Sequence, residues 1–180
     1  MPIQENYKKF IQDGYEGTEE WKKVEVIFEK LLKFLSDDHV IKEIQKVHIP
    51  KGKSQDIEKI IVRYAEQLGF TSNKKNLFKD YTVSKLRPDY FMPIGKTGIL
   101  IEVERGQTSQ NNNALKDLWK AHICKEADYL FIFVPMILKQ NVKDPDKVGG
   151  KPFNETVNRL STFFDKDNYT NVRGLIIYGY

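Results

Sequence analysis

A run of apolar residues near the middle of the second half of the chain most constrains the fold. From Asp128 to Val134 the sequence is aromatic and β-branched, and Pro135 ends the run. A strand with one face in solvent alternates polar and apolar residues, whereas a strand covered on both faces does not. The run therefore predicts a central strand of a sheet that carries helices on both sides.

The segments around this run supply the other elements. Apolar residues recur at helical spacing after Thr18 and Ser54, from Ala114 to Cys124, and after Asn154. Strands are expected at 87–92 and 98–105, which form a hairpin, at 172–178, and more weakly at 77–83. The order predicts an α/β fold with a mixed sheet flanked by helices. We expect a single domain over 1–180, with an N-terminal helical flank at 1–50 and a core at 54–180.

Composition and the N-terminal sequence further limit the classes of protein to which this chain can belong. No apolar run approaches the length of about 20 residues that a membrane-spanning helix needs. The N-terminus shows no secretory signal, and Cys124 is the single cysteine, so a cytoplasmic location is expected. A net charge of +4 permits a nucleic-acid partner without requiring one.

The hairpin carries carboxylates that the fold pattern does not explain. A turn centred between Gly95 and Lys96 places Asp89 opposite Glu102, with β-carbons about 5 Å apart. Glu104 lies two residues further along and faces the same side. Carboxylates gathered in apolar strands repel one another, and a bound cation would relieve that repulsion. Oxygen ligands favour Mg²⁺ or Mn²⁺ over Zn²⁺. The alternative is an exposed strand face with ordinary surface glutamates.

These residues also carry a resemblance to a known family. Arg87-Pro88-Asp89-Tyr90, followed by a hairpin and Ile99-Leu100-Ile101-Glu102-Val103-Glu104, resembles the active-site signature of the PD-(D/E)XK nucleases, which include many type II restriction endonucleases. The resemblance implies a restriction-endonuclease-like αβββαβ core and a Mg²⁺-dependent endonuclease, with Mn²⁺ able to replace Mg²⁺. It further implies double-stranded DNA as substrate and a homodimer. Glu104 stands where the family most often has lysine.

The resemblance assigns roles to individual residues. Asp89 and Glu102, with the Val103 carbonyl, would hold the metal, and Glu104 would orient or deprotonate the attacking water. Glu58, on the helix that begins at Ser54, is an auxiliary acid whose alternative is a surface glutamate. The expected DNA-contacting residues are Arg105, Gln107, Lys116 and Lys120. Arg105 and the two lysines are also candidates to replace the missing lysine.

Two other functions remain open at this point. One is a nuclease-like domain that binds DNA or a protein partner without cleaving, which the glutamate at position 104 favours. The other is a glycoside hydrolase that uses two carboxylates, but the chain is short and lacks an aromatic-lined sugar cleft.

Overall fold

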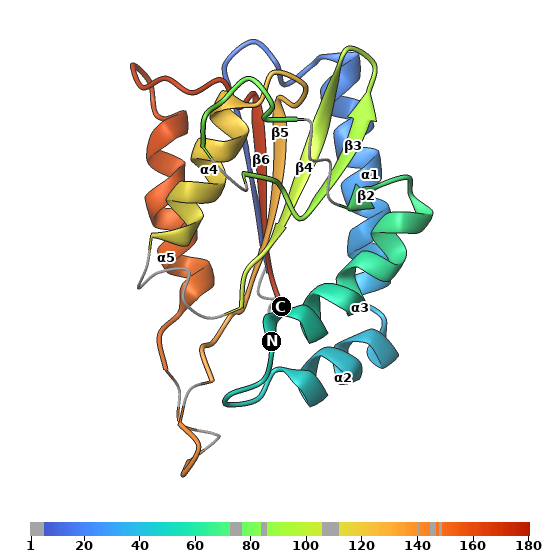
Figure 1. Ribbon diagram of the computed structural model, residues 1–180, viewed down its shortest axis with the longest axis vertical. Coiled ribbons are helices and arrows are strands. Elements are labelled where there is room, and N and C mark those ends of the chain that lie inside the picture. Colours follow the sequence, from blue (N-terminus) through green and yellow to red (C-terminus); the bar gives the residue numbers. More distant parts are fainter. Residues whose placement is uncertain are drawn as a thin grey trace.

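The computed structural model describes residues 6–72, 77–83, 86–105, 112–139, 141–144, 147 and 149–180. They form an α/β fold with one six-stranded sheet (Figure 1). The strands are β1 (Tyr7–Ile11), β2 (Thr71–Ser72), β3 (Tyr90–Ile94), β4 (Thr97–Val103), β5 (Tyr129–Val134) and β6 (Gly174–Gly179). The helices are α1 (Glu19–Leu35), α2 (Asp38–Val47), α3 (Ser54–Gln67), α4 (Asn113–Ile123) and α5 (Pro152–Ser161), followed by a 3₁₀ turn, η1 (Thr162–Phe164).

The sheet is mixed, as the sequence predicts. Its strand order is β1-β6-β5-β4-β3-β2, in which β4, β5 and β6 run parallel and the remaining pairs are antiparallel. Every residue of β5 is buried. The apolar run thus marks a strand that is covered on both faces.

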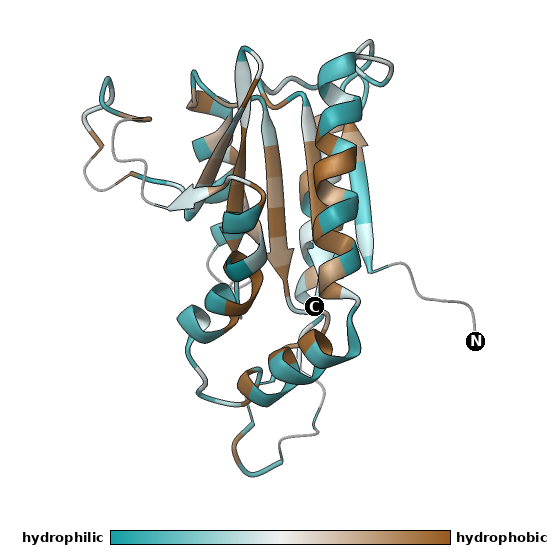
Figure 2. Cartoon of the chain, turned by 90° about the vertical axis from the view of Figure 1, so that its right-hand side faces the viewer, coloured by the Kyte–Doolittle hydropathy of each residue, from teal (hydrophilic) through white to brown (hydrophobic). Residues whose placement is uncertain are grey.

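Two apolar cores cover the two faces of the sheet. Alternate residues of β4 point to opposite sides, so Ile99 and Ile101 join the core beneath α1, α2 and α3, whereas Leu100 joins the core beneath α4 and α5. Figure 1 shows helices on both sides of the sheet, and Figure 2 shows that the central strands are largely apolar whereas the helices carry both apolar and polar residues. Thr18 caps α1 as predicted, because its Oγ1 accepts a hydrogen bond from the Trp21 N–H at 3.1 Å.

Three predictions about individual elements are wrong. The expected helical flank at 1–50 contains β1, which pairs with β6 and so belongs to the sheet. Residues 77–80 form a turn, and residues 81–83 are not in a strand either. The apolar residues of 114–124 predict an inward face that includes Leu115 and Trp119, but Trp119 is 40% exposed, and the buried residues of α4 are Ala114, Asp117, Leu118, Lys120 and Ala121.

None of the helices in the described residues has the length and apolar character that crossing a bilayer requires.

A hydrogen bond from the His48 side chain connects the end of α2 with the segment after β5. Its ring is 8% exposed, and Nε2 lies 2.8 Å from the Ile137 carbonyl oxygen, so Nε2 carries the proton and donates it. Nδ1 has no hydrogen-bond partner in the described part of the chain. Burial lowers the pKa of His48, and the hydrogen bond to Ile137 opposes that shift only in part.

This geometry predicts a loss of stability in mild acid. Because the folded-state pKa lies below the unfolded value, His48 contributes stability that is present above the unfolded pKa and is lost as the pH falls toward the folded pKa. The free energy of unfolding, measured by urea titration at pH 7.5 and pH 5, should fall less for His48→Gln than for the wild type. His39→Gln, which replaces an exposed histidine, is the matched control. Equal slopes for the wild type and His48→Gln would contradict the prediction.

Candidate active site

The β3–β4 hairpin has the predicted register. Tyr90 pairs with Ile101 and Phe91 with Leu100, so the residue numbers of each pair sum to 191 and Asp89 lies level with Glu102. Asp89 precedes β3, and its Oδ2 accepts a hydrogen bond from the Val103 N–H at 2.8 Å. The carboxylate of Asp89 is thereby held against the last residues of β4.

Glu102 lies in the interior and forms an ion pair there. Its side chain points toward α4, as does that of Leu100 two residues earlier, and it is 3% exposed. The Lys120 ammonium lies 2.6 Å from Glu102 Oε1 and 3.0 Å from Asp117 Oδ1. Lys120 and Asp117 are also buried. The alternative of an exposed strand face therefore does not apply to Glu102.

Glu104 lies just beyond β4 and is fixed through its backbone. Its N–H donates to the Phe133 carbonyl oxygen at 2.8 Å, and its own carbonyl oxygen accepts from the Tyr180 hydroxyl at 2.6 Å. Its side-chain Oε2 accepts from Asn113 Nδ2 at 3.3 Å. Burial, followed by the negative charge of Asp117, raises the pKa of Glu104 to about 7.

The cluster contains more carboxyl groups than cations. Its carboxyl groups are Asp89, Glu102, Glu104 and Asp117, and among the described residues Lys120 is the cation that forms ion pairs with two of them. Burial raises the pKa of Asp89, and burial together with Asp117 raises that of Glu102 while Lys120 opposes the shift. Burial by itself lowers the pKa of Lys120, but Glu102 and Asp117 outweigh it and hold the ammonium protonated. The arrangement favours a further positive charge.

Glu58 borders the same site from α3. It is half-buried and lines a cavity of about 380 Å³ together with Asp89. Burial, and then the charge of Asp89, raise the pKa of Glu58. The cavity is lined further by Gln55, Lys59, Ser72, Arg87, Pro88 and Tyr90. Glu58 therefore lies beside Asp89 of the acidic cluster, and its role as an auxiliary acid stays a prediction.

The expected DNA-contacting residues lie in different environments, some buried and some exposed. Lys120 is buried in the cluster, whereas Lys116 is exposed on the same helix. Arg105 donates from Nη2 to the Ile49 carbonyl oxygen in the segment between α2 and α3. Gln107 lies outside the described residues. Of the candidates to replace the missing lysine, Lys120 is the one whose ammonium pairs with Glu102.

Sequence reasoning missed Asp117 and Asn113, which join the cluster from α4. With Lys120 they follow the helical spacing i, i+4, i+7 on one side of the helix, and the sequence contains this polar stripe. An inward face that contains the apolar Leu115 and Trp119 would leave this stripe on the solvent side of α4. The helix instead buries Asp117 and Lys120, and the Lys120 ammonium pairs with a glutamate of the sheet.

The donor set matches a hard divalent cation in its chemistry. All candidate ligands are oxygen atoms, and Asp117 Oδ2 is buried without a hydrogen-bond donor in the described residues. Among those residues no three His, Cys, Asp or Glu side chains form a group arranged to hold a metal ion. The Lys120 ammonium lies between Glu102 and Asp117 in this conformation.

No protein-family model matches the sequence, and no curated protein matches it either.

Proposed function

We propose that this protein is a Mg²⁺-dependent DNA endonuclease with a restriction-endonuclease-like core. The proposal depends chiefly on one observation: the β3–β4 hairpin brings Asp89 level with a buried Glu102, and Lys120 enters beside Glu102 from α4. The succession α3, β2, β3, β4, α4, β5 supports it, because this is the order of an αβββαβ core. Double-stranded DNA is the proposed substrate, and a homodimer would present one site to each strand.

The side chains divide the chemistry among them. Asp89 and Glu102, with the Val103 carbonyl, would hold Mg²⁺, and Mn²⁺ could replace it. When bound, the ion would polarise the scissile phosphate and acidify a water molecule. Glu104 would orient that water and accept its proton. Lys120 opposes the effect of burial on the pKa of Glu102 and supplies the positive charge that the signature usually takes from a lysine at position 104.

The proposed catalytic role of the acids leads to a specific prediction. Wild-type protein is incubated with plasmid and phage DNA in Mg²⁺, in Mn²⁺ and in EDTA, beside the variants Asp89→Asn and Glu102→Gln. Cleavage should need the metal, and each variant should lose about 100-fold or more of the rate, because each removes a charged ligand of the ion that would stabilise the transition state. Gel analysis of nicked and linear product gives the rates.

Controls separate loss of chemistry from loss of structure. Glu29→Gln makes the same chemical change at an exposed position of α1 and should cleave like the wild type. Circular dichroism shows whether each variant folds. Equal cleavage in EDTA, or full activity in a folded Asp89→Asn variant, would overturn the proposal.

A second candidate function has its own support. The short Lys120–Glu102 contact already neutralises the central acid, and Glu104 replaces the usual lysine. A nuclease-like domain that binds DNA or a protein partner without cleaving would have this arrangement. Tight DNA binding that is indifferent to metal, without any cleavage, would favour this function over the first.

A further inference from the structure

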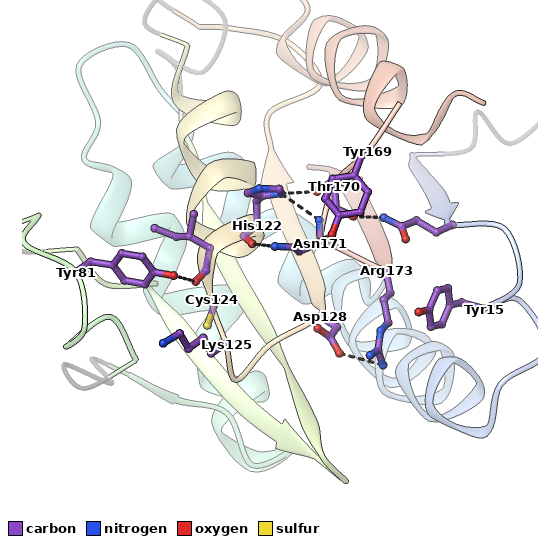
Figure 3. A pocket seen from close by; sticks show the side chains of 12 residues that line it. Tyr15, Tyr81, His122, Cys124, Lys125, Asp128, Tyr169, Thr170, Asn171 and Arg173 are labelled. Carbon is purple, nitrogen blue, oxygen red and sulfur yellow. Dashed lines mark hydrogen bonds and ion pairs between the residues drawn. The ribbon is translucent and has the colours of Figure 1, made fainter. Parts of the chain in front are cut away.

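A second and larger cavity lies at the other end of the sheet. It has a volume of about 590 Å³, within the range of small-molecule sites. It opens where β5 and β6 begin, whereas Glu102 lies near the end of β4, a strand parallel to β5. Its walls come from the segment after β1, from Tyr81 in the segment before β3, from the end of α4 and the residues that follow it, and from the approach to β6 (Figure 3). The acidic cluster uses none of these residues.

His122 presents a hydrogen-bond donor at this cavity. Its Nδ1 accepts from the Asn171 backbone N–H at 3.0 Å, so in the neutral ring the proton is on Nε2. Within the described part of the chain, Nε2 has no hydrogen-bond partner. Asn171 holds the residue a second time, because its Nδ2 donates to the His122 carbonyl oxygen at 2.8 Å. The contacts of the ring with Thr170 and Asn171 are drawn in Figure 3. They fix the ring in one tautomer, and its Nε2 donor stays unused among the described residues.

Gln12 presents an acceptor close by. Its Nε2 donates to the carbonyl oxygens of Thr170 and Val172, which settles the orientation of the amide and leaves Oε1 without a donor among the described residues. His122 is tied to the same Thr170, whose hydroxyl oxygen lies 3.4 Å from Nδ1. The residues that carry the free donor and the free acceptor, His122 and Gln12, are thus both held by contacts with Thr170.

The charged groups of the cavity are already paired. Arg173 contacts Glu20 at 3.1 Å and Asp128 at 3.0 Å, and Lys125 contacts Asp80 at 2.9 Å. A phosphate or carboxylate ligand would have to compete with these partners. The lining accordingly favours an uncharged ligand that both donates and accepts hydrogen bonds.

Aromatic rings supply the remaining walls, from Tyr15, Tyr81 and Tyr169. The guanidinium of Arg173 covers the ring of Tyr15 at 4.9 Å, and the Tyr81 hydroxyl donates to the Ile123 carbonyl oxygen. Tyr169 differs, because it is 75% exposed and meets the His122 ring edge-on at 6.2 Å. Its ring is available for stacking against a flat ligand.

We infer that this cavity binds an uncharged nucleobase. His122 Nε2–H donates to a carbonyl oxygen or ring nitrogen of the base, Gln12 Oε1 accepts from an amino group or ring N–H, and Tyr169 stacks on the ring. The base can belong to a free nucleoside or to an unpaired nucleotide at the end of a DNA strand. This inference does not depend on nuclease activity, since it concerns other residues at the other end of the sheet.

Binding of nucleosides tests the inference. Adenosine, guanosine, cytidine and thymidine are titrated separately by ligand-observed NMR, together with ribose and inorganic phosphate as comparison ligands. At least one nucleoside should bind saturably, and ribose and phosphate should not. A short single-stranded oligonucleotide and its abasic equivalent form a further arm, in which loss of the base should weaken binding. Binding should persist in Asp89→Asn, which separates this site from the acidic cluster.

Two variants probe the two contacts. His122→Asn keeps an acceptor for the Asn171 N–H but removes the Nε2 donor, and should weaken nucleoside binding about 5-fold, as expected for one neutral hydrogen bond. Tyr169→Ala changes an exposed side chain and should weaken it about 10-fold through lost stacking. His39→Asn is the matched control and should bind like the wild type. Absence of saturable binding of any nucleoside, equal binding of phosphate, or unchanged affinity in both variants would overturn the inference.

Discussion

Replacement of Lys120 by methionine is expected to lower the free energy of unfolding by about 3–5 kcal/mol at neutral pH. Methionine has a similar length but no charge, so Glu102 and Asp117 would remain in the interior without their cation. Removing one partner of a buried ion pair has a cost of this size, because the remaining charge is removed from water and no opposite charge compensates for the lost hydration. Urea denaturation measures the loss.

Two further variants isolate the charge effect. Glu102→Gln combined with Lys120→Met removes both charges of the closest pair and should recover part of the lost stability. Lys116→Met makes the same change one turn earlier on an exposed part of α4 and should alter stability by at most about 0.5 kcal/mol. The deficit of Lys120→Met should shrink as the pH falls, because the raised pKa of Glu102 allows that carboxyl group to become neutral. A loss below about 1 kcal/mol for Lys120→Met would show that the pair is not buried as described.

Phe131→Ala should destabilise the protein by about 3–5 kcal/mol, through a different mechanism. Phe131 lies in β5, is 1% exposed, and meets the rings of Phe28 at 5.6 Å and Phe70 at 6.4 Å. Truncation removes the buried ring and leaves a cavity between α1, α3 and the sheet, and surrounding side chains fill such a space only in part. Calorimetric unfolding measures the effect.

Tyr169→Ala is the control for that experiment. It also removes an aromatic ring, but from a side chain that is 75% exposed, and should change stability by about 0.5 kcal/mol or less. Similar losses in the two variants would mean that Phe131 is not at the centre of the core.

The sequence predicts those parts of the fold that local patterns encode. The uninterrupted apolar run identified β5 as a covered strand, and the turn at Gly95 and Lys96 was sufficient to place Asp89 level with Glu102. β1 is not predicted from the sequence because it is an edge strand. Lys8 and Lys9 interrupt the alternation of apolar and polar residues, and the strand is specified by its pairing with β6. Pairing between the two ends of a chain leaves little trace in a short window of sequence.

The candidate site was predicted in part for a similar reason. Asp89, Glu102 and Glu104 follow from the alternation of side chains along two strands. The interior position of Lys120 could not be inferred from helical periodicity, which assigns charged residues to the solvent side. It becomes favourable because Glu102 of β4 lies against the helix at this point, which is a tertiary contact, and adds its charge to that of Asp117, three residues earlier on α4 itself.

The place of β6 between β1 and β5 has a consequence for how the chain folds. The first strand cannot complete its ladder until residues 174–179 have been synthesised and have docked beside β5. A chain that joins its two ends in this way must close a very long loop before it gains the contacts, and such topologies fold more slowly than those built from near neighbours. During synthesis β1 would remain unpaired while the helical layers form. The rate-limiting step of folding should accordingly involve the arrival of β6.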